Sequence, residues 1–294
     1  MNLVVTLSSL DDIEILSKSG ADTFVLGNEL FANRLVNSYT NTEISEANDL
    51  IKSFNKKIYI NANLIVHNNM LEKINEYLIF IKTLNVDGIV FGDMGVYVLA
   101  KKLELEHLLI YNPETLNTNY YDPIFWSKKG IKGITISKEL TLEDILVIAK
   151  DSPIETSIIG HGHLNMFHSR RPLIENYFKH NDEDPTEYIN NRNLTLVEEI
   201  RNEAYPVFQD SHGTHIFREK AMQSFNEANT LKDSVNDFYI YGIFKDSNYV
   251  VEIVKVYREI LDNDNQKFID KTLLKFKENH DAGFLYKKTV YDKY

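Results

Sequence analysis

The chain has 294 residues, 43% hydrophobic and 26% charged, which is enough for one large globular domain or two ordinary ones. It has no cysteine, which excludes disulfides, thiolate nucleophiles, cysteine-bound zinc and iron–sulfur ligation by this chain. The net charge of −11 argues against stand-alone nucleic-acid binding, because phosphate neutralisation supplies most of that affinity. No stretch is long and apolar enough to span a bilayer, and the first residues lack a signal peptide's basic segment, so we expect a cytoplasmic protein.

Strand-like and helix-like segments alternate through the first half of the chain. The predicted strands are β-branched or aromatic runs at residues 3–7, 21–27, 57–63, 86–91, 108–111, 133–137 and 154–159. The predicted helices lie between them, at residues 9–20, 43–54, 69–84, 96–105, 125–129 and 141–150. This alternation favours a (β/α)8 barrel. A doubly wound open sheet is the alternative, although no G-x-G-x-x-G follows the first strand.

The alternation breaks after the seventh predicted strand. The remaining segments are a polar loop or lid, a β-hairpin, a helix, an eighth strand and a closing helix, predicted at residues 180–193, 194–209, 217–230, 237–244 and 249–261. We therefore expect an α/β fold in which residues 1–262 form a (β/α)8 TIM-like barrel. A hairpin insertion of about residues 180–236 would separate strands 7 and 8, and residues 263–294 would form a tail packed on the barrel.

Polar residues follow the carboxyl ends of the predicted strands, where barrels carry their functional groups. They form a ring of Thr6, Ser8, Asn28, Glu29, Asn61, Asn63, Asp93, Asn112, Glu114, Lys138, Glu139, His161, His163 and Lys245. Asp93 could act as a catalytic acid or base, or cap the next helix. Asn63 and Asn112 could orient a ligand or only tie down loops. No G-x-S-x-G motif is present, so serine hydrolysis has little support.

The stretch of residues 154–173 gathers histidines and arginines behind a predicted strand. His161, His163 and His168 could bind a metal, since imidazole is a common ligand, or could hydrogen-bond neighbouring loops or contact a partner. Arg170 and Arg171 could bind phosphate or carboxylate through the guanidinium fork, or lie on an exposed helix face. No fixed-spacing metal motif accompanies the histidines.

Short motifs recur in order along nearly the whole chain. Examples are Asn63-Leu64-Ile65-Val66-His67, Ser137-Lys138-Glu139-Leu140 and Gly283-Phe284-Leu285. Their order and spacing resemble the U32 "collagenase-like peptidase" family. The family signature, roughly E-x-F-x-x-G-[AS]-x-C-x6-C, is matched here at Glu155 and Gly160, whereas His163 and Arg170 occupy its cysteine positions.

The resemblance implies a branch without the iron–sulfur cluster that the cysteines of other members hold. Several members are tied to hydroxylation: of the tRNA wobble uridine to 5-hydroxyuridine, of a 23S rRNA cytidine and of ubiquinone. Our leading hypothesis is therefore a subunit for tRNA wobble-uridine hydroxylation, without a cofactor of its own. It would act beside a cysteine-bearing U32 paralogue and reach tRNA through that complex. Substrate or RNA would be bound by Asn63, Asn112, Arg170, Arg171 and Lys245.

Two other functions stay open from the sequence. The first is a peptidase of the U32 type, with a metal held by His161, His163 and His168. The second is a non-catalytic binding or scaffold barrel that lost the cluster. The catalytic residues are unknown, and the candidates are Glu155, His161, His163 and Asp93.

Overall fold

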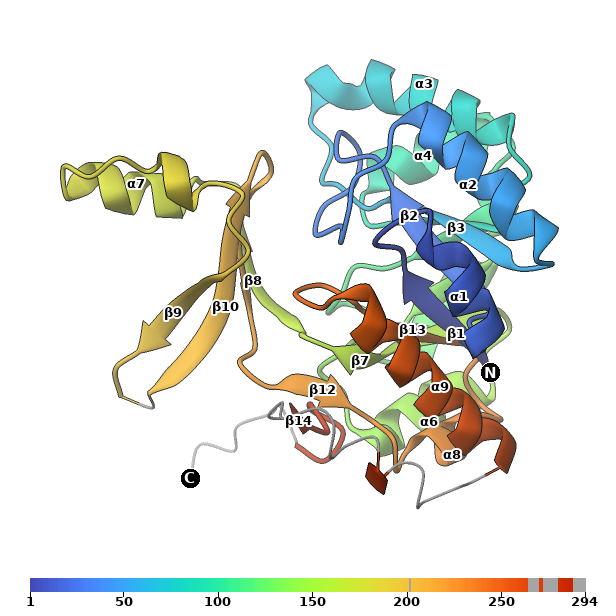
Figure 1. The fold of residues 1–294 in the computed structure, drawn as a ribbon. Coiled ribbons are helices and arrows are strands. Elements are labelled where there is room, and N and C mark those ends of the chain that lie inside the picture. The colour runs from blue at the N-terminus through green and yellow to red at the C-terminus, as the bar shows by residue number, and fades with distance from the viewer. Residues whose placement is uncertain (201, 264–269, 272–279, 288–294) are drawn as a thin grey trace.

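A closed barrel organises the chain. The computed structural model describes residues 1–200, 202–263, 270–271 and 280–287. Among the described residues, the parallel strands of the barrel are β1 (Asn2–Thr6), β2 (Thr23–Gly27), β3 (Lys57–Ala62), β4 (Gly88–Phe91), β5 (Leu109–Tyr111), β6 (Gly133–Thr135), β7 (Glu155–Gly162) and β13 (Asp237–Ile240). Each pairs with the next, and β13 closes the ring by pairing with both β1 and β7 (Figure 1). The predicted (β/α)8 barrel is confirmed.

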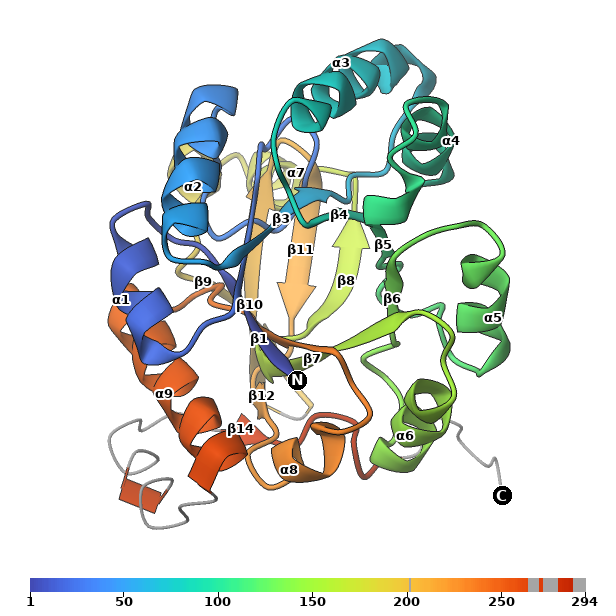
Figure 2. The ribbon, with the colours of Figure 1, turned by 90° about the vertical axis from the view of Figure 1, so that its right-hand side faces the viewer.

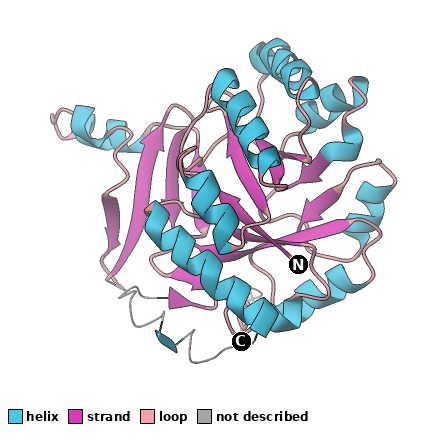
Figure 3. Cartoon of the chain, turned by 45° about the vertical axis from the view of Figure 1, so that its right-hand side comes forward, coloured by secondary structure: helices cyan, strands magenta, loops and turns pink. Residues whose placement is uncertain are grey.

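Helices surround these strands (Figures 2 and 3). The helices packed around the barrel are α1 (Asp12–Ser19), α2 (Asn41–Ser53), α3 (Leu71–Lys82), α4 (Met94–Lys102), α5 (Tyr121–Ser127), α6 (Leu142–Lys150), α8 (Ala228–Leu231) and α9 (Ser247–Asn263), with single 3-10 turns at Asn68–Met70 and Glu106–Leu108. Local signals set their starts: Thr40 and Glu43 form a capping box at α2, and the Thr141 hydroxyl accepts the Asp144 N–H at α6. None of the described helices has the length and apolar character needed to cross a membrane.

Two layers of apolar residues fill the barrel. The larger layer lies between the strands and the helices, and the smaller one fills the barrel interior with Val4, Val25, Tyr59, Val90, Ile110 and Tyr239. At the floor of the barrel, the carboxylate of Asp237 accepts hydrogen bonds from the Tyr59 hydroxyl and the Asn2 amide, each 2.8 Å long. Burial raises the pKa of Asp237. This end of the barrel is therefore packed and closed by side chains.

A second sheet projects beside the carboxyl end of the barrel (Figure 1). Its antiparallel strands are β8 (Asn165–Ser169), β11 (Gly213–Phe217), β10 (Glu203–Asp210) and β9 (Leu194–Glu198), in that spatial order. We call these four strands the insertion sheet. They are accompanied by α7 (Leu173–His180) and a 3-10 turn at Thr186–Tyr188. The predicted hairpin is confirmed by the β9–β10 pairing, but the sheet begins at Asn165, earlier than the insertion boundary that we expected.

The helix predicted at residues 217–230 is wrong. Phe217 ends β11, and β12 (Ala221–Gln223) pairs antiparallel with the end of β7 before the short helix α8 begins. The β7 backbone offers hydrogen bonds to this segment, and such tertiary pairing overrides a local helical pattern.

Part of the expected tail lies within the described residues. Strand β14 (His280–Asp281) runs parallel to β12, and the Leu285 carbonyl accepts the Leu142 N–H at 2.9 Å. Arg218 makes two hydrogen bonds to Asp281, 2.9 and 2.6 Å long, at the same place. Most of residues 263–294 lie outside the described residues, so the packing of the whole tail stays a prediction.

Candidate functional site

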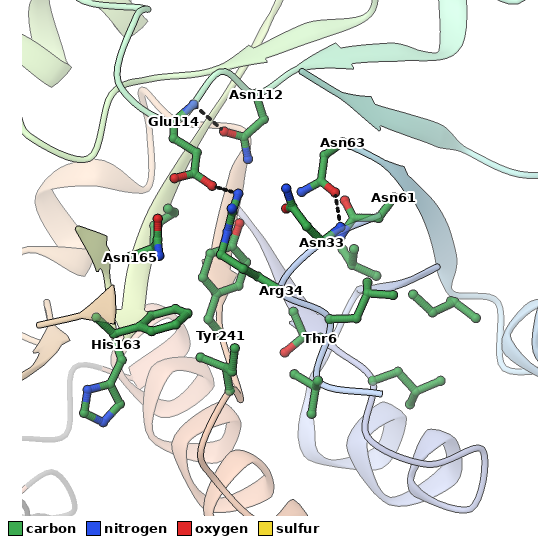
Figure 4. Close-up of a pocket in the computed structure, with 18 of the residues that line it drawn as sticks. Thr6, Asn33, Arg34, Asn61, Asn63, Asn112, Glu114, His163, Asn165 and Tyr241 are labelled. Atoms are coloured by element: carbon green, nitrogen blue, oxygen red, sulfur yellow. Dashed lines mark hydrogen bonds and ion pairs between the residues drawn. The ribbon is translucent and has the colours of Figure 1, made fainter. Parts of the chain in front are cut away.

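A narrow cavity of about 50 Å³ lies at the mouth of the barrel, which we define as the carboxyl ends of its strands. Its polar lining comes from strand ends, from the β2–α2 connection and from the insertion sheet (Figure 4). These polar side chains are Thr6, Asn33, Arg34, Asn37, Asn61, Asn63, Asn112, Glu114, Lys138, His163, Asn165 and Tyr241. Much of the polar ring predicted from the strand ends therefore lies around one opening.

An ion triad occupies the centre of this mouth cavity. The Glu114 carboxylate pairs with the Arg34 guanidinium and accepts a 2.7 Å hydrogen bond from Lys138 Nζ. The side chains of Arg34, Glu114 and Lys138 are 14%, 25% and 4% exposed. Burial alone would raise the pKa of Glu114, but the charges of Arg34 and Lys138 outweigh it and lower the pKa to about 2. Glu114 is therefore an anchored anion at neutral pH and a poor proton acceptor.

The backbone at this triad is unusual. Arg34 and Glu114 have φ angles of 54° and 67°, in the left-handed region that residues with a side chain rarely adopt. Such conformations cost about 1–3 kcal/mol each, and they cluster at functional sites. The geometry here places both charged groups in the opening.

The loop that carries Arg34 is held from two sides. We call residues 28–40 the mouth loop. The Asn33 N–H donates to Asn63 Oδ1 at 3.0 Å, which ties the loop to the end of β3. From the insertion sheet side, Arg192 donates to the carbonyls of Leu35 and Val36 at 2.7 and 3.1 Å. The insertion therefore helps to fix Arg34 across the opening.

Amides and a tyrosine complete the cavity. Asn112 Oδ1 accepts the Glu114 N–H at 3.1 Å, and Tyr241 also lines the cavity. Burial raises the pKa of Tyr241 to about 12, so its hydroxyl stays protonated. The Asn33 side chain is buried, and its Oδ1 has no hydrogen-bond partner among the described residues. Buried polar atoms without a partner are few in folded proteins, and this one belongs to a residue that lines the cavity.

The structure separates His161 from this cavity. A β-bulge in β7 matches Tyr239 to Ile159 and Ile240 to His161, so the strand's alternation shifts at Gly160. The His161 ring consequently lies outside the barrel, with Nε2 2.8 Å from the Tyr249 hydroxyl, against helix α9. It is fully buried there and serves packing rather than the mouth cavity.

The other two histidines of the predicted metal site also have separate partners. His163 lines the mouth cavity, and its Nδ1 donates to the Arg218 carbonyl at 2.9 Å. His168 lies on β8, stacked on His215 with ring centroids 4.7 Å apart, and its Nε2 donates to the His212 carbonyl. Burial lowers the pKa of His168, which favours the neutral ring. No group of three or more potential ligands suited to a metal occurs in the part of the chain that the structure describes.

Two carboxylates proposed as catalytic lie elsewhere. Glu155 begins β7 at the closed end of the barrel, where its carboxylate is 3.1 Å from Lys132 Nζ. It is not brought together with the mouth cavity. Asp93 caps α4 by accepting the Gly95 N–H at 2.7 Å, and it also accepts the Val66 N–H at 3.2 Å. The geometry thus favours the capping role for Asp93.

The predicted cationic residues lie around the outside of the mouth. Arg170 is exposed in the β8–α7 connection and donates to the Ile65 carbonyl at 3.3 Å. Arg171 follows it and is exposed, so neither arginine lies on the helix face that we considered. Lys245 follows the eighth barrel strand and lies over the Tyr249 ring, 5.0 Å from its centroid.

Sequence reasoning missed Arg34, Asn33 and Tyr241 as site residues. Tyr241 could have been found, because it continues the inward alternation of Asp237 and Tyr239 along the eighth strand. Arg34 had a weaker signal: a long connection after the second strand, on the functional side of the barrel.

Comparison with known proteins agrees with this architecture. The model of peptidase family U32 matches residues 8–291. The chain belongs to this family. It is 30% identical to tRNA hydroxylation protein P2 of Bacillus subtilis (strain 168), with 98% of each chain covered. It is 20% identical to tRNA hydroxylation protein P1 of the same bacterium over 88% of this chain, and spans 63% of the length of P1.

A solved relative shares the fold. The structure of the U32 peptidase Mk0906 superposes with a TM-score of 0.52 at 16% identity, covering 82% of this chain and 92% of the other. The superposition supports a common barrel fold. Because the sequence identity is so low, it does not support a statement about activity.

Proposed function

We propose that this chain acts in tRNA hydroxylation, in the formation of 5-hydroxyuridine at the wobble position, as the subunit without an iron–sulfur cluster. The observation that carries the proposal is the match to tRNA hydroxylation protein P2 over nearly the full length of both chains. A cysteine-bearing U32 paralogue would be its partner and would supply the redox chemistry, since this chain has no cysteine to ligate a cluster. The likeness to P1 and P2 of one bacterium supports such a pair of paralogues.

In this proposal the mouth cavity binds the substrate. Asn63, Asn112 and the Arg34–Glu114–Lys138 triad would hold and orient it. The exposed Arg170 and Arg171 and the nearby Lys245 would contact RNA phosphate or the partner around the mouth. With a net charge of −11, the chain would rely on the partner for much of the non-specific attraction to tRNA.

A peptidase has weaker support from the site. The chain has no thiol nucleophile, and Glu114, the carboxylate in the mouth cavity, is held ionised with a pKa of about 2. The three histidines suggested as metal ligands have separate hydrogen-bond partners. A purified chain that cleaves gelatin or casein, with loss of cleavage on chelation, would reinstate this alternative.

The direct test is a deletion strain analysed by nucleoside mass spectrometry. We expect 5-hydroxyuridine in tRNA to fall in the deletion strain and to return when the gene is restored. The paralogue should co-purify with a tagged chain from the restored strain. An unchanged 5-hydroxyuridine level would refute the proposed function, and a chain that restores the modification without binding the paralogue would refute the partner.

Point variants separate a substrate-binding role from a scaffold. We expect the double variant Arg170→Ala, Arg171→Ala to lower 5-hydroxyuridine; a paralogue that stays bound would assign these arginines to RNA phosphate, and loss of the paralogue would assign them to the partner. Lys73→Ala, at an exposed position of α3, is a control for loss of surface charge. A double variant His163→Ala, Arg170→Ala with full modification would instead favour the non-catalytic barrel.

A further inference from the structure

The charges of the mouth cavity are largely occupied with one another. Arg34 and Lys138 both bind the Glu114 carboxylate, and this arrangement is stable because Glu114 is ionised. The remaining polar lining contains several neutral amides (Figure 4). Amides offer one acceptor oxygen and a donor NH2 group, so they recognise neutral, planar, polar groups.

The neighbouring contacts fix how two of these amides face. Asn63 Oδ1 accepts the Asn33 backbone N–H, which leaves Asn63 Nδ2 for another acceptor. Asn33 Oδ1 is a buried acceptor without a partner in the described part of the chain. Asn61 adds a third amide, on the same side of Arg34 as Asn33 and Asn63 (Figure 4). Together these three side chains place amide oxygens and NH2 groups around one narrow space.

This pattern complements one nucleobase edge. The Watson–Crick edge of uracil carries a carbonyl, an N–H and a second carbonyl, and it therefore needs an acceptor between donors. Cytosine replaces one of these carbonyls with an NH2 group and the N–H with a bare nitrogen. In the same position, its NH2 group would face a donor and its bare nitrogen would face an acceptor. The planar Arg34 guanidinium, fixed by Glu114, is a surface on which a base can stack.

We propose that Asn33, Asn61 and Asn63 bind the uracil base of tRNA by its Watson–Crick edge, with Arg34 as the stacking surface. This inference rests on the proposed function, and it assigns base recognition to this chain rather than to its partner. A wobble base lies in a single-stranded loop, so turning it into a pocket costs little unstacking energy. With its Watson–Crick edge in the cavity, the base turns its C5–C6 edge, where the hydroxyl is added, toward the open mouth.

Photo-crosslinking tests the placement of the base. The probe is an anticodon stem–loop with 4-thiouridine at the wobble position, irradiated with the complex of this chain and its paralogue. We expect crosslinked peptides from the mouth loop or from residues 61–66 or 112–117 of this chain. Crosslinks that map only to the paralogue would overturn the inference. If deletion of the gene still abolished 5-hydroxyuridine, the proposed function would survive that result.

A matched pair of variants tests the amide itself. Asn63→Asp keeps the oxygen that accepts the Asn33 N–H but replaces the NH2 donor with a negative oxygen. Asn69→Asp adds the same charge at an exposed position of the 3-10 turn Asn68–Met70, which does not line the cavity. We expect the first variant to lower the crosslink yield about tenfold and the second to leave it unchanged, since one lost base contact is worth about 1–3 kcal/mol.

Competition with unlabelled stem–loops tests the choice of base. A stem–loop with uridine at the wobble position should compete about tenfold better than one with cytidine. Equal competition, or equal yields from the two Asp variants, would show that these amides do not read the base. A normal yield of the paralogue complex for both variants confirms that the comparison reports on the cavity.

Discussion

Glu114→Gln tests whether the ion triad is the main electrostatic contact of the mouth cavity. Glutamine keeps the size of the side chain but removes its charge, so Arg34 and Lys138 would lose their common counter-ion. Removing one partner of a largely buried ion pair is costly because the remaining charges stay desolvated. We therefore expect a clear loss of stability at neutral pH.

The pKa of Glu114 gives the magnitude. Its fall from the ordinary value of 4.5 to about 2 corresponds to about 3 kcal/mol, at about 1.4 kcal/mol per pH unit. Because the folded pKa is depressed, this stabilisation is complete above pH 4.5 and is lost as the pH falls toward 2. About 2 kcal/mol of it should be gone by pH 3, so the stability difference between wild type and Glu114→Gln should shrink by that amount.

Urea unfolding from pH 7 to pH 3 measures this difference. The single tryptophan, Trp126, is buried and reports unfolding by fluorescence. Glu14→Gln is the matched control, since Glu14 pairs with Lys18 on the exposed surface of α1 and its loss should cost at most about 0.5 kcal/mol. A Glu114→Gln variant no less stable than this control, or a difference that does not change with pH, would refute the reasoning.

Three further changes probe the barrel and the insertion. Gly160→Ala would place a Cβ 1.9 Å from the Phe238 ring, and we expect thermal unfolding to show a loss of about 1–3 kcal/mol. Burial lowers the pKa of His215, so stability should decline as the pH drops below its ordinary value of 6.5; His215→Gln should flatten this decline in melting temperature. Burial raises the pKa of Asp237, so its contribution to the free energy of unfolding is lost as the pH rises above 3.8. In urea unfolding, Asp237→Asn should remove this dependence of the free energy of unfolding on pH.

The barrel was predictable because its signals are local. Each early strand is a short β-branched or aromatic run, and each helix carries its own cap or apolar face, as with Thr40 at α2 and Thr141 at α6. Strand ends could then be found without knowing which strands are neighbours. The sequence therefore predicts Thr6, Asn61, Asn63 and other members of the ring that lie around one cavity in the structure.

The rest of the site depends on contacts distant in sequence. Arg34 crosses the mouth because Asn63 and Arg192 hold its loop, and neither contact leaves a local mark. His161 was assigned to the wrong side because a single bulge at Gly160 reverses the inward–outward alternation. The helical pattern before α8 is misleading because strand β12 pairs with β7, and residue patterns alone do not show this pairing.

The strained backbone at Arg34 and Glu114 explains why the cavity needs the insertion. Neither residue type favours a left-handed conformation, so the ion triad must offset the cost of two such residues. Arg192 adds hydrogen bonds to the carbonyls of Leu35 and Val36, directly after the strained Arg34. The segment before β9 therefore helps to hold this loop conformation. The proposed base recognition at the mouth would therefore depend on the same contacts that anchor the mouth loop.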